Sequence, residues 1–369
     1  MKILQLSSAQ APGGGERHLA DLANALAARG HEVHATLRPD SPLINELGGV
    51  SPKNITTLPL RNALDAVSAR KLARYVGEHK IQIVHAHLAR DYPLASYATR
   101  RNPGSKLIIT RHVLFPLNRL HSITLSRVAR IIAVSEAVAR QLHTHGSIPV
   151  ERIAVISNGI EVQRFVAKTQ FDRSNFRRQW KFLEDGLLIG TVGEITALKG
   201  HEDFLRAASI IRRKYPRAEF IIAGLDASRD GKNRAALEAL IAQLDLAGAV
   251  QDVGWVDNLA SLYCALDVFV SASHSESFGL AIAEAMASAT PVVATATGGA
   301  SEIITNEETG VLVPLGDAEA LAAAVIDLLG DEDKRRRLAA AGRELIQQQF
   351  SLGRMVEETE KIYREVLID

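Results

Sequence analysis

Short apolar runs alternate with amphipathic segments along the first half of the chain. The runs favour strands that are buried on both faces, as in a parallel sheet. Segment 16–29 carries Leu19, Leu22, Ala23 and Leu26 at helical spacing, and Gly30 ends it. This alternation predicts βαβ units in a doubly wound parallel sheet. The predicted strands are 2–7, 31–37, 81–87, 106–112 and 130–135.

The alternation resumes after a polar, charged run at 167–185 and predicts a second α/β sheet. Its predicted strands are 187–192, 219–224, 267–272, 291–295 and 310–314. Its predicted helices are 201–214, 233–246, 258–265, 278–289, 317–329 and 331–349, and a last helix follows at 352–366. A chain of 369 residues is long enough for two domains that each bury a core.

Composition narrows the class of protein. No segment approaches the ~18 unbroken apolar residues of a membrane span, and the first apolar run is too short for a signal peptide. Cys264 is the single cysteine, which excludes an internal disulfide and favours a reducing compartment. We therefore expect a cytoplasmic protein.

Charge is unevenly distributed, although the net charge is +1. Residues 1–165 carry 21 Lys and Arg against 11 Asp and Glu, whereas the rest carry 22 against 31. No nucleic-acid-binding motif accompanies the basic half, so we expect no nucleic acid partner. An anionic membrane surface fits better, with a solvated basic face as the alternative. The residues concerned are Arg100, Arg101, Lys106, Arg111, Arg119, Arg127, Arg130 and Arg140, near Leu114, Phe115, Leu117 and Leu120.

The stretch Glu276 to Glu284 follows a predicted strand and enters a predicted helix. Backbone N–H groups at the start of a helix, here around Ser277, Phe278 and Gly279, favour an anion. Glycine lets a phosphate approach the main chain. Helical spacing would place Glu276 and Glu284 within a quarter turn of each other, where they can accept hydrogen bonds from hydroxyls beside the phosphate.

This stretch and its continuation, E-S-F-G-L-A-I-A-E, E-A-M-A and P-V-V-A-T-x-x-G-G, resemble the retaining nucleotide-sugar glycosyltransferases of family 4. The resemblance implies the GT-B fold, in which two Rossmann-like domains face a cleft. It implies an N-terminal acceptor-side domain at 1–165, a nucleotide-sugar domain at 166–350, and a final helix at 351–369 that returns to the first domain. The reaction implied is sugar transfer to an acceptor hydroxyl with retention at the anomeric carbon, without a metal or other cofactor.

The resemblance also assigns residues of the donor site. Glu276 would contact the transferred sugar, Glu284 the ribose, and the backbone from Phe278 to Leu280 the diphosphate. Lys199, in V-G-E-I-T-A-L-K-G-H, would neutralise the diphosphate. Glu194 departs from the family pattern, because an arginine is expected at its position.

Two sites in the first half are also similar to the family. Gly13 and Gly14 would let backbone approach the diphosphate or acceptor, and a plain turn is the alternative. His112 follows a predicted strand at the carboxyl edge of the sheet, where ligands bind in open α/β folds. The family carries a histidine there, near the sugar and diphosphate; an edge histidine with ordinary hydrogen bonds is the alternative.

Other readings remain open. The glycine loop is not G-x-G-x-x-G, so a dinucleotide is not expected. His85, His87 and His112 could form a metal site, but hydrogen-bonded positions near the acceptor are favoured. The D-x-D at 331–333 fits a helix start better than a metal site. A nucleotide-sugar epimerase and a non-catalytic nucleotide-sugar-binding protein are the functional rivals. We expect a UDP-sugar donor and a lipid-linked or cell-surface glycan acceptor.

Overall fold

The computed structural model describes residues 1–11, 13–115, 117, 121–144, 148–165, 170–228 and 230–368. Side chains are not described at 122, 123 and 170–172. The chain divides into two compact units. The first unit comprises Met1–Gly159 and Leu352–Asp369, and the second comprises Ile160–Ser351. The domain limits drawn from the sequence were 165 and 350, so the first division in the structure falls six residues earlier, at 159.

The first unit contains a seven-stranded parallel sheet with the strand order β3-β2-β1-β4-β5-β6-β7. Its strands are β1 (Lys2–Ser7), β2 (Glu32–Leu37), β3 (Ile55–Thr57), β4 (Ile83–Ala86), β5 (Lys106–Arg111), β6 (Arg130–Ala133) and β7 (Ile153–Val155). Its helices are α1 (Gly14–Ala28), α2 (Leu43–Glu46), α3 (Ala66–Glu78), α4 (Tyr92–Arg101), α5 (His121–Leu125), α6 (Glu136–His143) and α15 (Leu352–Ile368). The order reverses between β1 and β4, which is the point where doubly wound sheets bind ligands.

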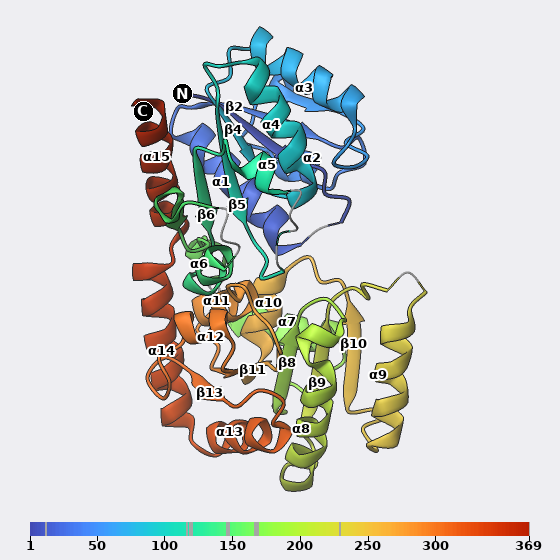
Figure 1. The fold of residues 1–369 in the computed structure, drawn as a ribbon. Helices are drawn as coiled ribbons and strands as arrows, with labels where there is room; N and C mark the ends of the chain where they lie inside the picture. Colours follow the sequence, from blue (N-terminus) through green and yellow to red (C-terminus); the bar gives the residue numbers. More distant parts are fainter. Residues whose placement is uncertain are drawn as a thin grey trace. The chain divides into compact units, whose positions relative to one another are not determined.

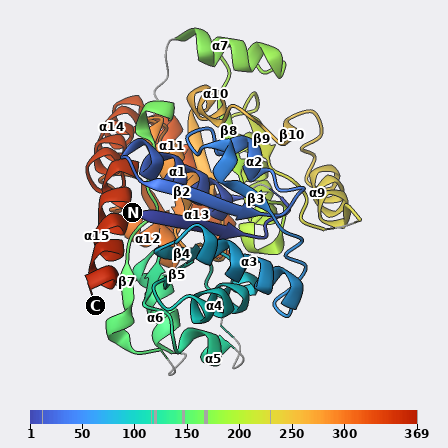
Figure 2. The same ribbon diagram turned by 90° about the horizontal axis from the view of Figure 1, so that it is seen from above.

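The last helix of the chain belongs to the core of the first unit. Met355, Val356, Tyr363 and Val366 of α15 are buried with residues of α1 and of the sheet. Figure 1 shows α15 beside α1, and Figures 1 and 2 show α3 and α4 side by side on the other face of the sheet. Glu360 of α15 is almost fully buried and accepts hydrogen bonds from Arg29 and His31. The first unit is therefore built from both ends of the chain.

The second unit contains a six-stranded parallel sheet with the order β10-β9-β8-β11-β12-β13. Its strands are β8 (Leu188–Val192), β9 (Glu219–Ala223), β10 (Val250–Gly254), β11 (Val268–Ser271), β12 (Val292–Thr295) and β13 (Val311–Val313). Its helices are α7 (Gln170–Gln179), α8 (His201–Lys214), α9 (Lys232–Gln243), α10 (Leu259–Ala265), α11 (Leu280–Ala287), α12 (Gly298–Ile303), α13 (Ala318–Gly330) and α14 (Glu332–Gln349).

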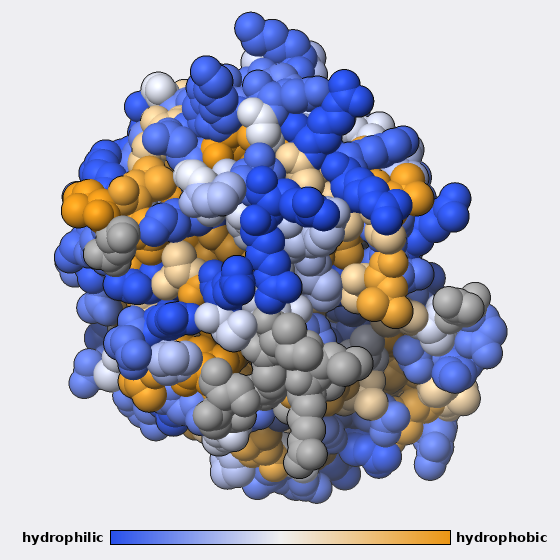
Figure 3. All heavy atoms as spheres, turned by 45° about the horizontal axis from the view of Figure 1, so that its top comes forward, coloured by the Kyte–Doolittle hydropathy of each residue, from blue (hydrophilic) through white to orange (hydrophobic). Residues whose placement is uncertain are grey.

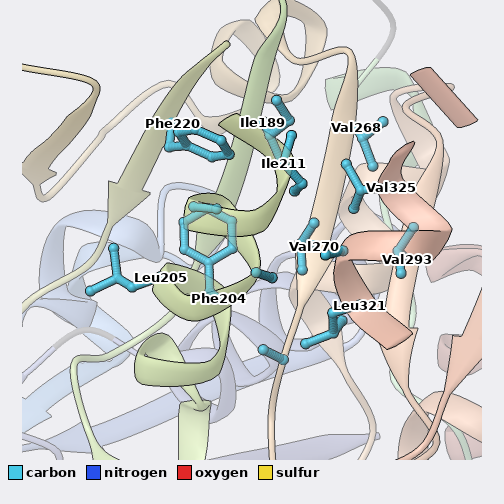
Figure 4. Close-up of a cluster of buried hydrophobic side chains, with 14 of the residues drawn as sticks. Ile189, Phe204, Leu205, Ile211, Phe220, Val268, Val270, Val293, Leu321 and Val325 are labelled. Atoms are coloured by element: carbon cyan, nitrogen blue, oxygen red, sulfur yellow. The ribbon is translucent and has the colours of Figure 1, made fainter. Parts of the chain in front are cut away.

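The core of the second unit lies between one face of this sheet and helices α8 and α13 (Figure 4). Phe204 of α8 meets Phe220 of β9 edge to face, with ring centroids 6.1 Å apart. Val270 of β11 and Leu321 of α13 are buried in the same cluster. Large apolar side chains buried in this way contribute about 1.5–3 kcal/mol each, so this core fixes the strands whose ends carry the polar loops described below.

The fold class predicted from the sequence is confirmed, because each unit is a parallel, doubly wound α/β sheet with the strand order of a Rossmann-like domain. Asp317 and Asp331 cap α13 and α14 by accepting hydrogen bonds from Ala320 N and Lys334 N. The acid at 331 therefore serves a helix start, as the sequence indicated. Three strands were missed: β3, β7 and β10.

Candidate active site

Lys199 and Glu276 meet at the carboxyl edge of the second unit's sheet. Lys199 follows β8 and Glu276 follows β11, and these neighbouring strands flank the point where the strand order reverses. Nζ of Lys199 lies 2.6 Å from Oε1 of Glu276, and the hydroxyl of Ser273 donates to the same oxygen at 2.8 Å. The two residues assigned to the diphosphate and to the sugar are therefore joined to each other.

Gly200 explains how the Lys199 loop comes so close to β11. Its φ is 63°, in the left-handed region, and an added Cβ would lie 1.9 Å from the carbonyl oxygen of Ala272. A side chain at this position would therefore collide with the backbone. Gly200 therefore permits the loop to approach β11, and the neighbouring Lys199 makes the ion pair with Glu276.

The loop before α11 differs from the prediction in one respect. The helix begins at Leu280, not Phe278, because Gly279 adopts φ 103° and forms its N-cap. Glu276 precedes the helix, and the helical spacing used to relate it to Glu284 does not apply, because residues 276–279 are not helical. The backbone N–H of Gly299 donates to the carbonyl oxygen of Glu276 at 3.1 Å, which gives the second glycine of P-V-V-A-T-x-x-G-G a direct role in holding this loop.

The predicted donor residues around Gly279 differ in exposure. Phe278 is buried, and its ring meets Phe350 edge to face at 5.7 Å, so its side chain belongs to the core and leaves only backbone for a ligand. Ser277 and Leu280 are half-buried at the start of α11. These residues lie at the start of α11, where the sequence predicts an anion site.

Glu284 is buried within α11 and does not point freely into solvent. Its Oε2 accepts a hydrogen bond of 3.0 Å from the hydroxyl of Tyr263, which is itself fully buried on α10. Tyr263 was not predicted from the sequence, because a tyrosine in an apolar helix does not indicate a carboxylate partner. The pair fixes one oxygen of Glu284 within the protein.

The departure at Glu194 has a structural explanation. Its side chain is exposed and takes part in no ion pair within the described residues. The loop is instead held through the backbone, since Nε2 of His201 lies 3.1 Å from the carbonyl oxygen of Glu194. Glu194 therefore occupies the arginine's position without placing a carboxylate against Lys199.

In the first unit, the glycine loop packs beside His112. Helix α1 begins at Gly14, with Gly13 as its N-cap in an extended conformation. A Cβ at Gly15 would lie 3.5 Å from the imidazole of His112. The predicted helix start at Glu16 was therefore two residues late, and the backbone of this loop lies close to the predicted catalytic histidine.

His112 directly follows β5 and stacks on His87, with ring centroids 5.6 Å apart and planes at 21°. Nε2 of His112 lies 3.3 Å from Nδ1 of His87. Burial lowers the pKa of both imidazoles well below the ordinary value of 6.5, so both are neutral at pH 7.

The trio His85, His87 and His112 is not the cluster that the structure brings together. Both ring nitrogens of His85 are hydrogen-bonded, to the hydroxyls of Tyr363 at 2.6 Å and Thr110 at 2.7 Å. The third imidazole beside His87 and His112 is instead His18 of α1. Sequence analysis missed His18, because strand spacing can pair His85 with His87 but gives no information about a residue on a helix.

A second polar group that the sequence did not reveal lies where the order of the first sheet reverses. Asp91, after β4, accepts a 2.8 Å hydrogen bond from the backbone N–H of Ser8, after β1. Arg90 donates to the hydroxyl and the carbonyl oxygen of Ser8. Burial raises the pKa of Asp91 to about 6, which makes it an unusually basic carboxylate.

The arginine side chains of the basic region at 100–140 differ in their exposure to solvent. Arg100, Arg101, Arg127 and Arg140 are exposed, but Arg111 is buried and donates to the carbonyl oxygen of Phe115. Phe115 is 64% exposed and Leu117 is buried, and both line a hollow that also includes Val138 and Leu142. Arg119 and Leu120 lie outside the described residues.

Hydrophilic side chains cover most of the face drawn in Figure 3, where hydrophobic ones form small, separate groups. None of the helices in the described part of the chain combines the length and the apolar composition that a membrane crossing requires.

Comparison with known proteins assigns both halves of the chain. Residues 12–164 match the family described as Glycosyltransferase Family 4, and residues 172–345 match Glycosyl transferases group 1. N-acetyl-alpha-D-glucosaminyl L-malate synthase of Bacillus anthracis is 27% identical, over 95% of this chain and 93% of that protein. The lipopolysaccharide core biosynthesis glycosyltransferase LpsE of Rhizobium meliloti is 29% identical, over 92% of each chain. The crystal structure of HepE from Anabaena in complex with UDP has a TM-score of 0.87 and 21% identity, over 99% of this chain and 100% of that one.

Proposed function

The chain belongs to the glycosyltransferases of family 4 and has their GT-B fold, and from this we propose that it transfers a sugar from a nucleotide diphosphate sugar to an acceptor hydroxyl. The observation that carries the proposal is the contact between Lys199 and Glu276 at the carboxyl edge of the second sheet. This contact supports the proposal, because a cation that suits a phosphate and a carboxylate that suits hydroxyls lie together near the start of α11. A nucleotide diphosphate sugar needs these three features side by side.

The proposed transfer retains the configuration of the anomeric carbon. The acceptor oxygen forms a bond to that carbon on the face that the nucleotide leaves. The carbon–oxygen bond to the diphosphate breaks with its electron pair going to the phosphate oxygen, which takes the acceptor's proton. The protein's part is to stabilise the charge that develops on the diphosphate, through Lys199 and the N–H groups before α11, and to orient the sugar through Glu276 and His112.

Charge stabilisation by these groups removes the need for a metal ion in the proposed reaction. The carboxylate of Glu276 would repel a phosphate if it stood alone. Its ion pair with Lys199 and its hydrogen bond from Ser273 offset that repulsion and leave Oε2 to accept from sugar hydroxyls. Lys199 is about 29% exposed, so its remaining N–H groups can reach a ligand.

We favour uridine as the nucleobase and a cell-envelope glycan or lipid-linked sugar as the acceptor. The support for uridine is that HepE was crystallised with UDP. The support for the acceptor class is that LpsE is a lipopolysaccharide core glycosyltransferase. Exposed Arg100, Arg101, Arg127 and Arg140, with exposed Phe115, support a peripheral contact between the first unit and an anionic bilayer.

The experiment that tests the proposal has two stages. Calorimetric titration with UDP-, GDP-, ADP- and dTDP-sugars identifies the donor, and we expect a UDP-sugar to bind most tightly. Turnover is then followed with candidate acceptors, with and without a chelator, and the anomeric configuration of the product is read by NMR. Conversion of the donor without acceptor would indicate an epimerase instead. Binding without nucleotide release for any acceptor would indicate a binding protein.

A further inference from the structure

Three histidines converge at the carboxyl edge of the first unit's sheet. His18 lies on the second turn of α1, His87 follows β4 and His112 follows β5. One ring nitrogen from each lies within 4.8 Å of the corresponding nitrogens of the other two. The proposed glycosyl transfer uses His112 but assigns nothing to the cluster as a whole.

The closest pair already has the spacing of two metal ligands. Nδ1 of His87 and Nε2 of His112 are 3.3 Å apart. Two imidazole nitrogens bound to one tetrahedral zinc ion, each about 2.0–2.1 Å from the metal, are also separated by about 3.3 Å. In the metal-free protein this distance is that of a hydrogen bond between the two rings, and an ion would replace that bond with little movement of either ring.

A hydrogen bond that His87 donates to Gln5 determines which ring nitrogen of His87 keeps its lone pair. Oε1 of Gln5 lies 2.8 Å from Nε2 of His87, and an amide oxygen only accepts, so Nε2 carries the hydrogen. Nδ1 is then the unprotonated nitrogen, turned toward His112. Metal-binding histidines are typically oriented in this way, by a hydrogen bond from the ring nitrogen that does not bind the metal.

His18 supplies an independent observation. It is 5% exposed, and neither of its ring nitrogens has a hydrogen-bond partner among the residues that the structure describes. Burial lowers the pKa of His18 to about 4, and the nearby Asn158 partly opposes this effect. No hydrogen bond of normal geometry joins His18 to Asn158. A buried polar group left without a partner costs about 1–3 kcal/mol, so its retention calls for an explanation.

We propose that His18, His87 and His112 form a binding site for a divalent transition metal ion of the zinc class. Three neutral imidazoles supply the ligands, and the fourth tetrahedral position is left to solvent, because the cluster offers three ligand nitrogens among the described residues. His85 takes no part, because its nitrogens face the hydroxyl groups of Tyr363 and Thr110 and do not converge with those of the other three histidines. The site takes no ligand from the second unit, but it shares His112 with the proposed sugar transfer, so a bound ion would withdraw that imidazole from the sugar.

The test is a metal titration of the tag-free, full-length chain after treatment with a chelator. Cobalt(II) should bind one ion per chain and give the visible absorption of a tetrahedral site, and zinc should displace it. Gln5→Leu removes a supporting hydrogen bond and should lower the metal affinity by about 10- to 100-fold. His18→Ala removes a proposed ligand and should lower the metal affinity at least as much. His143→Ala, which removes an exposed histidine of the same unit, should bind as the wild type does.

Absence of one-to-one binding, or an equal loss in His143→Ala and His18→Ala, would overturn the proposal. A second measurement does not depend on whether the variants fold. Crystals of the wild-type chain soaked in zinc should show an anomalous peak among His18, His87 and His112. A peak elsewhere with none at this cluster would also overturn it.

Discussion

The ammonium of Lys199 lies 2.6 Å from a carboxylate oxygen of Glu276. These residues are 77 positions apart in the chain and meet because β8 and β11 are neighbours in the sheet. Each limits the charge that the other presents, so the site is close to electrically neutral before a donor binds. In the proposed reaction a diphosphate would compete with Glu276 for the lysine, while the sugar hydroxyls would engage the carboxylate.

Replacing Lys199 should weaken donor binding. We expect Lys199→Ala to lose about 1.5–3 kcal/mol of binding free energy, the range for a hydrogen bond to a charged group, because the diphosphate loses its side-chain cation and faces an uncompensated Glu276. Isothermal titration with the nucleoside diphosphate measures the loss. Arg206→Ala removes an exposed cation from α8 and should bind normally. Normal binding by Lys199→Ala would place the diphosphate elsewhere.

Replacing Glu276 should act on turnover. We expect Glu276→Ala to raise the barrier by about 2–4 kcal/mol, equivalent to about a 30- to 1000-fold lower kcat, if its carboxylate holds sugar hydroxyls in the transition state. Glu202→Gln, an exposed acid on α8, is the control. The double variant with Lys199→Ala should lose less than the sum of the single losses, because the two side chains interact directly. Unchanged kcat in folded Glu276→Ala would remove this residue from the mechanism.

The hydrogen bond between Tyr263 and Glu284 should be measurable in stability. Tyr263→Phe keeps the buried ring and removes the hydroxyl that donates to Glu284, so we expect a loss of about 1 kcal/mol in the free energy of unfolding. Donor affinity should fall as well, because Glu284 would be less firmly oriented toward the ribose. Urea unfolding and donor titration report the two effects. Tyr215→Phe, whose hydroxyl lies outside this site, should leave donor affinity unchanged.

Asp91 should give the first unit a dependence on pH. Its pKa is about 6 in the folded chain and about 3.9 in an unfolded one, so the folded state binds more protons between these values. The free energy of unfolding should therefore fall by up to about 3 kcal/mol as the pH rises from 4 to 7. Asp91→Asn remains neutral, so its stability relative to wild type should increase over this range. A constant difference between the two proteins would contradict the raised pKa.

Glu360 should matter to the first unit alone. It is almost fully buried and hydrogen-bonded to Arg29, His31 and Arg364, so Glu360→Ala removes these bonds and should lower the free energy of unfolding by about 1.5–3 kcal/mol. Hydrogen exchange should rise in the first unit and stay unchanged in the second. Glu357→Ala, an exposed acid on the same helix, should have little effect on either.

The strands that the sequence did not reveal share one property. β3, β7 and β10 are edge strands of their sheets, and most of their residues are only partly buried. Central strands have continuous apolar sequences because both faces are covered, whereas an edge strand such as V-Q-D-V-G does not. Hydrophobic pattern therefore predicted the class of fold and the inner strands, but not the full width of either sheet.

The site was predictable where chemistry depends on local sequence and not where it depends on strand order. Lys199, Glu276 and Glu284 were each identified, but the ion pair and the partnership with Tyr263 follow from which strands and helices are neighbours. His18 was missed for the same reason. No spacing within α1 indicates that its second turn lies against the ends of β4 and β5.

Ribosomes synthesise a protein from its first residue to its last, and the discontinuous first unit makes this order consequential. Its core includes Met355, Val356, Tyr363 and Val366, which are synthesised only after the whole of the second unit. The second unit is one continuous segment, so its synthesis is complete before that of the first unit. N-terminal domains usually fold first during synthesis. Here the order is reversed, because the core of the second unit can be completed before the core of the first. Until α15 emerges, the apolar surface of α1 and its sheet is available to chaperones.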